Sequence, residues 1–197
     1  MDATEALPRS QAVRRDGVVQ AALKLAADGG YDAVQMREVG AEAGVALGTI
    51  YRYFSSKDAL LAAALVAWVE DLERRVTARP PTGATTAARV ASILRRAHRA
   101  MEKQPKLAEA VITAMVSPDP ATMDAQAQTG IAMGRVLGRA MSADLDRSTA
   151  AKVTTVLTHV WFSALIIWVN GRDDDISGVG DEVELACHLM LDHFDQG

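Results

Sequence analysis

Cysteine, aromatic residues and long apolar runs are all scarce in this 197-residue chain. The single cysteine, Cys187, excludes an internal disulfide framework, and its apolar neighbours predict a buried thiol rather than a redox sensor. The longest apolar run, residues 160–169, is about half as long as a membrane-spanning helix requires. The N-terminus is polar and charged, unlike a secretion signal. These absences predict a soluble, cytoplasmic protein that does not engage a membrane.

A strong excess of one charge is also missing. The net charge of −4 excludes the broadly basic surface of a nonspecific nucleic-acid coat. Residues 9–57 nevertheless contain seven basic and five acidic residues, so a specific DNA-binding surface remains compatible with the sequence. Alanine and leucine dominate, apolar residues recur at helical spacing, and no segment alternates as a strand would. We therefore predict an all-α fold.

The motifs of common enzymes are absent as well. The sequence has no glycine-rich phosphate loop and no nucleophile elbow, so neither a catalytic residue nor a cofactor is expected. His188 and Asp192 stand four residues apart, a spacing that can hold a metal. Two ligands without a third do not make a metal site, and none is expected.

The most informative stretch is residues 44–57. Gly44 follows a short helical pattern and can supply the positive φ of a tight turn, while Ile50 and Phe54 are spaced to face a core. Small side chains, hydroxyl-bearing aromatics and bases are left to face outward, as a DNA-contacting helix requires. The residues expected to contact DNA, counting the start of the preceding helix, are Gln35, Met36, Arg37, Ala46, Leu47, Gly48, Thr49, Tyr51, Arg52, Tyr53 and Lys57.

These residues divide by chemistry. The guanidinium of Arg37 can pair with a guanine edge, and Leu47 can touch a thymine methyl, so Arg37 and residues 47–49 are expected to read bases. Tyr51, Tyr53 and Lys57 are expected to hold phosphates, which carry no sequence information. The alternative for Arg37 is an ordinary surface arginine paired with a nearby acid.

The run Gly-Val-Ala-Leu-Gly-Thr-Ile-Tyr-Arg-Tyr-Phe-Ser-Ser-Lys-Asp-Ala-Leu, with Arg15, residues 30–31 and residues 36–39 before it, resembles the helix-turn-helix of the TetR family of transcriptional regulators. The resemblance implies a three-helix DNA-binding domain over residues 12–72, with the helix-turn-helix at about 35–54. It also implies a helical ligand-binding and dimerisation domain over residues 80–197, and a homodimer on palindromic double-stranded DNA. Gly40 departs from the family pattern, which usually has alanine there.

The second half reads as helices after the break at residues 80–83. Flexible methionines and large apolar side chains suit a pocket for an apolar effector. The residues expected to line it are Met101, Met115, Met133, Leu137, Trp161, Leu165 and Trp168.

Residues 29–37 and 99–110 resemble regulators of cholesterol catabolism within the same family, which implies a steroid or fatty acyl-CoA ligand. A coenzyme A tail would lie near the bases that surround Pro105, whose alternative role is a solvated face: Arg95, Arg99, Lys103 and Lys106.

Excess apolar surface on residues 148–170 and 183–194 predicts the dimer interface. Two functions therefore stand: a ligand-responsive DNA-binding repressor, or a helical dimerising DNA-binding module without a small-molecule ligand. The acidic turn at residues 173–175 leaves the identity of the ligand open.

Overall fold

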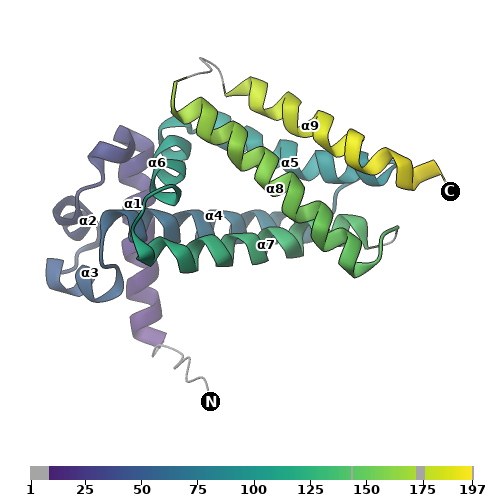
Figure 1. Ribbon diagram of the computed structural model, residues 1–197. Coiled ribbons are helices and arrows are strands. Elements are labelled where there is room, and N and C mark those ends of the chain that lie inside the picture. The colour runs from purple at the N-terminus through teal and green to yellow at the C-terminus, as the bar shows by residue number, and fades with distance from the viewer. Residues whose placement is uncertain (1–8, 143, 172–175, 197) are drawn as a thin grey trace.

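The computed structural model describes residues 9–142, 144–171 and 176–196, and within them the chain forms helices and connecting turns without a strand (Figure 1). The prediction of an all-α fold is confirmed. In chain order the elements are α1 (Arg9–Ala33), α2 (Met36–Ala43), α3 (Leu47–Tyr53), α4 (Lys57–Ala78), α5 (Thr86–Glu102), α6 (Pro105–Met115), the 3-10 turn η1 (Pro120–Thr122), α7 (Met123–Met141), α8 (Arg147–Val169), α9 (Ser177–Leu191) and the 3-10 turn η2 (Asp192–Gln196).

Glycines set the two turns of the N-terminal unit. Gly30 interrupts α1 with a φ of 74°, and Gly44 ends α2 with a φ of 65°. The N–H of Val45 then donates to the carbonyl oxygen of Gly40 at 3.0 Å, which folds the chain back toward α3. Ile50 and Phe54 are buried, as their spacing predicts.

The glycine at position 40 has a packing reason. A Cβ atom there would lie 3.0 Å from the carbonyl oxygen of Val45 and 3.3 Å from Cδ1 of Ile50. An alanine would therefore push α3 away from α2 by a few tenths of an ångström. The departure from the family pattern permits a closer approach of the two helices.

Helix α4 connects the two halves. Its N-cap is Ser56, whose Oγ accepts from the N–H of Ala59 at 3.0 Å. From there α4 packs against α1, α6 and α7. Figure 1 shows it running from α2 and α3 to the far end of the molecule. Any displacement of α4 therefore changes packing contacts in both halves of the molecule.

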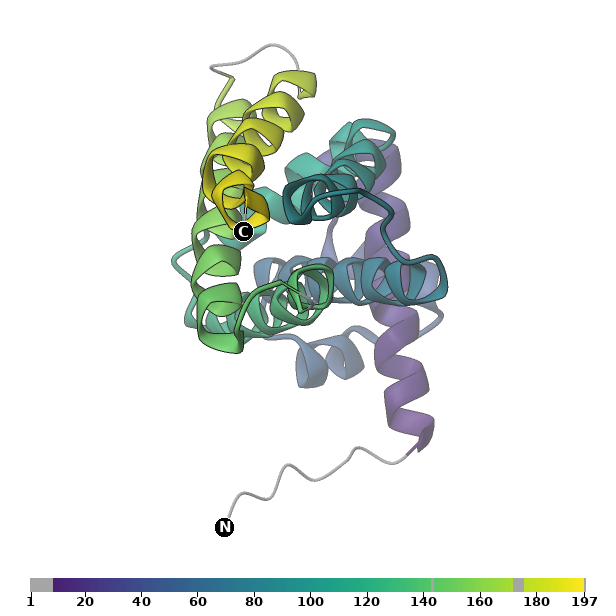
Figure 2. The ribbon, with the colours of Figure 1, turned by 90° about the vertical axis from the view of Figure 1, so that its right-hand side faces the viewer.

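The outer layer of the C-terminal half is formed by α8 and α9, which lie side by side (Figure 2). Helix α8 starts two residues earlier than a cap at Ser148 would place it, because the N-cap is Asp146. Its carboxylate accepts from the N–H groups of Ser148 and Thr149. Among the described residues, α8 alone has the length and hydropathy of a membrane-spanning helix, but it packs against α6, α7 and α9.

Candidate DNA-reading surface and ligand cavity

The outward face of α2 and α3 carries the residues that were expected to contact DNA, and we call this face the DNA-reading surface. Side chains of Ile50 and Phe54 fix α3 to the core, so the opposite side of this short helix faces solvent. Leu47 is 42% exposed and Tyr51 is 51% exposed. Seven of the eleven predicted residues are exposed: Gln35, Arg37, Ala46, Leu47, Gly48, Tyr51 and Arg52; Met36, Thr49, Tyr53 and Lys57 are half-buried.

The side chain of Arg37 is accessible to an external partner. It lies in the first turn of α2 and is exposed, and it makes no hydrogen bond or ion pair within the described part of the chain. The alternative of a surface arginine paired with an acid therefore has no partner to support it. Gln35, just before α2, has its Nε2 within 2.9 Å of the carbonyl oxygen of Asp32.

The predicted phosphate contacts differ in their accessibility. Lys57 donates from Nζ to the carbonyl oxygen of Tyr31 at 3.2 Å, and the same Nζ lies 3.6 Å from the centre of the Tyr31 ring. The hydroxyl of Tyr53 is buried and has no hydrogen-bond partner among the described residues. Of the two tyrosines, Tyr51 is the one whose side chain is exposed to solvent without rearrangement.

A hydrogen-bonded latch joins the start of α4 to both halves of the molecule. Asp58 accepts from the hydroxyl of Tyr31 and from Oγ of Ser117, each at 2.5 Å. Ser56 donates to the carboxylate of Asp119, in the segment that leads to α7. Burial, followed by the hydrogen bond to Asp58, raises the pKa of Tyr31 to about 12. We call Tyr31, Ser56, Asp58, Ser117 and Asp119 the α4 latch.

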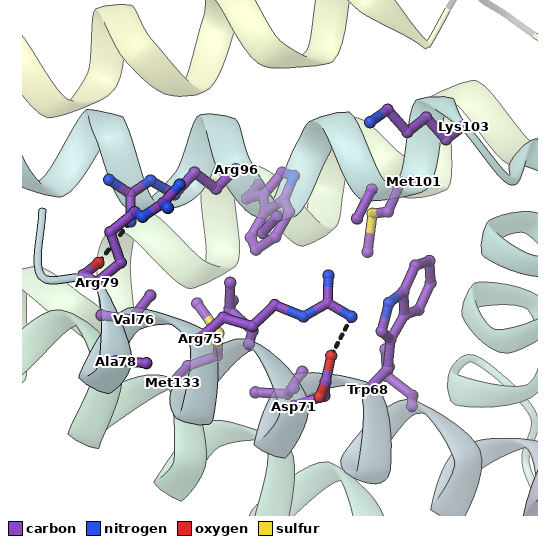
Figure 3. Close-up of a pocket in the computed structure, with 16 residues that line it drawn as sticks. Trp68, Asp71, Arg75, Val76, Ala78, Arg79, Arg96, Met101, Lys103 and Met133 are labelled. Carbon is purple, nitrogen blue, oxygen red and sulfur yellow. Dashed lines mark hydrogen bonds and ion pairs between the residues drawn. The ribbon is translucent and has the colours of Figure 1, made fainter.

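The C-terminal half contains a cavity of about 760 Å³ between α4 and α5, which we call the central cavity (Figure 3). Met101, Met133 and Trp161 line it, three of the seven residues expected from the sequence. Met115, Leu137 and Leu165 are buried in the core, Trp168 is half-buried, and none of these four lines the cavity. Helical periodicity identifies an apolar face but not which part of it borders a void.

Helix α4 supplies most of the lining that sequence reasoning missed. Trp68, Leu72 and Val76 follow one another at intervals of four residues on its apolar face, and all three line the cavity. Arg75 lies on the same helix and Arg79 just after its end, while Arg96 lies on α5 and Lys103 just after it. Apolar side chains and four bases thus share one cavity.

Of the bases predicted around Pro105, only Lys103 borders the cavity. Arg95 instead pairs with Glu184 of α9, and Nζ of Lys106 donates to the carbonyl oxygen of Asp28 at 3.0 Å. Arg99 is exposed outside the cavity lining. The sequence shows that these bases lie close to Pro105. Which of them faces the cavity depends on the orientation of α5, which the sequence does not give.

The cavity lining contains more basic than acidic side chains. Asp71 is the acid of the lining, and it is paired with Arg75, whose side chain extends along α4 toward it in Figure 3. Arg96 donates from Nη1 to the carbonyl oxygen of Arg79 at 2.8 Å, which leaves its charge uncompensated. The indole Nε1 of Trp161 is buried without a hydrogen-bond partner in the described chain. The cavity therefore suits a ligand that is apolar in body and negatively charged at one end.

Other reactive groups give no second site. Cys187 is buried, as predicted, and burial raises the pKa of its thiol to about 12, so the reactive thiolate is suppressed. His188 Nδ1 lies 3.0 Å from Oδ1 of Asp192. No group of three potential metal ligands occurs within residues 9–142, 144–171 and 176–196.

Comparison with known proteins matches both halves of the chain. The family described as bacterial regulatory proteins, tetR family, matches residues 18–64, and a tetracyclin repressor-like C-terminal domain matches residues 83–190. The HTH-type transcriptional repressor KstR of Rhodococcus jostii is 37% identical over 182 residues, which cover 92% of this chain and 84% of that protein.

Solved structures share the fold. A TetR transcriptional regulator from Rhodococcus sp. RHA1 has a TM-score of 0.81 at 26% identity and covers 92% of this chain and 97% of its own. Thermus thermophilus FadR, a TetR-family transcriptional repressor in complex with lauroyl-CoA, has a TM-score of 0.64 at 19% identity, covering 89% of this chain and 92% of its own. The latter similarity concerns the fold alone.

Proposed function

The chain belongs to the TetR family of bacterial transcriptional regulators, and from this premise we propose that it is a repressor that an apolar, anionic ligand releases from its operator. One observation carries the proposal: α4 begins beside the DNA-reading surface and ends as a wall of the central cavity. We assign residues 12–72 to the DNA-binding domain and residues 80–197 to the ligand-binding and dimerisation domain.

The reading surface is proposed to enter the major groove of double-stranded DNA. Arg37 and residues 47–49 read base edges, because these side chains are exposed and Arg37 has no partner within the described chain. Tyr51 and Lys57 hold phosphates and set the orientation. Tyr53 joins them only if its hydroxyl turns out of its buried position.

A homodimer on a palindromic operator follows from the small footprint of one such surface. Two copies related by a two-fold axis would contact half-sites about 34 Å apart. The outer face of α8 and α9 supports this, because Leu185 and Leu189 are 59% and 74% exposed there. Val156 and Ile167 extend the same apolar surface along α8.

The ligand is proposed to be a steroid or fatty acyl-CoA. Met101, Met133 and Trp161 would hold its apolar body, and Arg75, which lines the same cavity, would hold its negative charge. The lauroyl-CoA bound by the Thermus thermophilus neighbour has this chemistry. Sugars and free nucleotides lack the apolar body that the methionines and tryptophans favour.

Ligand binding is proposed to act on DNA through the α4 latch. A ligand that fits the cavity better when α4 is displaced favours the displaced arrangement by its difference in affinity. Asp58 then loses its hydrogen bonds to Tyr31 or Ser117, and the two reading surfaces of the dimer change their separation. No step of this mechanism needs a cofactor or a catalytic residue, and cytoplasmic localisation is consistent with it.

Binding to the promoter upstream of the protein's own gene tests the proposal. Fluorescence anisotropy of that fragment should report tight binding, lost on titration with lauroyl-CoA or a steroid acyl-CoA but not with coenzyme A alone. Tight, specific binding that no apolar acyl compound relieves would favour the dimerising module without a ligand. Absence of specific DNA binding by folded protein would overturn both.

A further inference from the structure

A second, polar hollow of about 720 Å³ lies beside the central cavity, between α1 and α4. We call it the α1 groove. From α1 its polar lining comes from Arg15, Gln20 and Lys24 with the acid Asp16, and from α4 it comes from Arg74 with the acids Glu70 and Asp71. Gln104 and Gln128 add amide groups from other elements. Whereas the central cavity is mainly apolar, this groove offers bases, amides and the flat ring of Trp68.

The cavity and the groove share a wall. Trp68, Asp71 and Arg75 line both hollows, and Figure 3 shows these three side chains together at one side of the cavity. Oδ1 of Asp71 accepts from Arg74 at 2.9 Å, and the other oxygen pairs with Arg75. The side chains of Arg75 and Asp71 are 69% and 30% exposed. Such a pair is weak enough for a ligand charge to replace it.

Placing the charged nucleotide tail of a long acyl-CoA among the apolar side chains of the cavity would be costly, so the tail must leave by some route. One route passes Arg79 and Arg96 at the end of α4, where Arg96 is already bound to the carbonyl oxygen of Arg79. The other passes the shared wall. There Arg75 can exchange the carboxylate of Asp71 for a phosphate of the ligand, and the freed Arg74 can bind a second one.

We propose that the α1 groove receives the phosphate-bearing tail of an acyl-CoA whose acyl group occupies the central cavity. This inference rests on the proposed function and assigns it a second ligand compartment. In the groove the tail meets Arg15, whose guanidinium lies 5.0 Å from the ring centre of Phe54, the residue that ends α3. A phosphate that draws Arg15 away from Phe54 acts directly on the reading helix.

Isosteric charge changes on the intact protein test this route. Gln20→Glu places a negative charge on an exposed position of the groove, and Gln11→Glu places the same charge on α1 outside the groove lining. The probes are lauroyl-CoA and lauroyl-pantetheine, which has the same acyl thioester without phosphates. Dissociation constants are measured by tryptophan fluorescence in the absence of DNA, and far-UV circular dichroism checks folding.

We expect Gln20→Glu and Arg74→Gln to weaken lauroyl-CoA binding about threefold to tenfold, less at high salt, and to leave lauroyl-pantetheine unchanged. Gln11→Glu and Arg96→Gln should leave the affinity ratio of the two probes as in the wild type. A ratio that responds to Arg96→Gln but not to the groove variants would place the tail at the end of α4 and overturn this inference alone. A wild-type protein that binds operator DNA but neither probe would overturn the ligand assignment, and with it the groove.

Discussion

Ser117→Ala isolates the latch between the two halves of the molecule. Ser117 lies between α6 and η1, and its hydroxyl donates to Asp58 at 2.5 Å across a sequence separation of 59 residues. Alanine removes this bond, together with the longer one that Oγ of Ser117 accepts from the N–H of Asp119 at 3.3 Å, and leaves the other hydrogen bond of Asp58, from Tyr31, in place. The substitution is small and the position is half-buried, so the packing around it should be preserved.

The size of the effect follows from the kind of bond. A hydrogen bond to a charged group contributes about 1.5–3 kcal/mol, and partial exposure to water reduces this to about 1 kcal/mol here. If the bond exists only in the DNA-competent arrangement, its loss lowers operator affinity by up to about fivefold. The ligand concentration that releases half of the DNA should fall by a similar factor.

Operator anisotropy, ligand release and urea unfolding should be measured on the same preparations. Thr155→Ala is a matched control, because that hydroxyl is exposed and bonds only to the carbonyl oxygen of Ala151 in its own helix. A Ser117→Ala protein that loses unfolding free energy but keeps wild-type DNA affinity and ligand release would refute the coupling role. The latch would then be a contact that stabilises the fold and nothing more.

Four further outcomes are expected. Lys57→Ala should weaken operator and random DNA alike and reduce the slope of log affinity against log salt by about one unit, measured by anisotropy at several salt concentrations; an unchanged slope would contradict a phosphate contact. Arg37→Ala should cost about 1–3 kcal/mol on the operator and relax preference at one position per half-site, whereas an equal loss on every sequence would return Arg37 to the phosphate class. Leu189→Asp should give a folded monomer in sedimentation, and an unaltered dimer would exclude this face as the interface. Because Tyr31 keeps its proton to a pKa of about 12 while the unfolded chain loses it near 10, unfolding free energy should fall as pH rises through that window, and Tyr31→Phe should remove this part of the fall.

Local residue chemistry accounts for several helix ends. Gly44 adopts the positive φ that ends α2, Ser56 caps α4, and Pro105 opens α6, each as its residue type predicts. Asp146 was missed as the cap of α8 because Ser148, two residues on, has the same preference. Neighbouring capping residues compete, and only the path of the preceding turn decides between them.

The residues that line the central cavity could not be predicted as well from the sequence. Met101 and Leu137 both lie on apolar helix faces, yet only Met101 borders the void. Burial against a neighbour and burial against a cavity produce the same periodicity in the sequence. Trp68 was missed for the same reason. The latch is also beyond a local pattern, because Asp58 and Ser117 meet only through the packing of α6 on α4.

The geometry of α4 explains how a ligand in the central cavity can change the hydrogen bonds of the α4 latch. Glu73 is held by Arg135 of α7 through two of its nitrogens, at 2.9–3.1 Å, and also by Arg139, which fixes the helix beside the cavity. Asp58 lies fifteen residues before this anchor, an arm of about 22 Å at the rise of an α-helix. A tilt of about 3° around Glu73 therefore moves Asp58 by about 1 Å, enough to carry its 2.5 Å hydrogen bonds to the limit of bonding distance. A small tilt of α4 that accommodates the ligand near Glu73 can therefore break a hydrogen bond of Asp58 beside the DNA-reading surface.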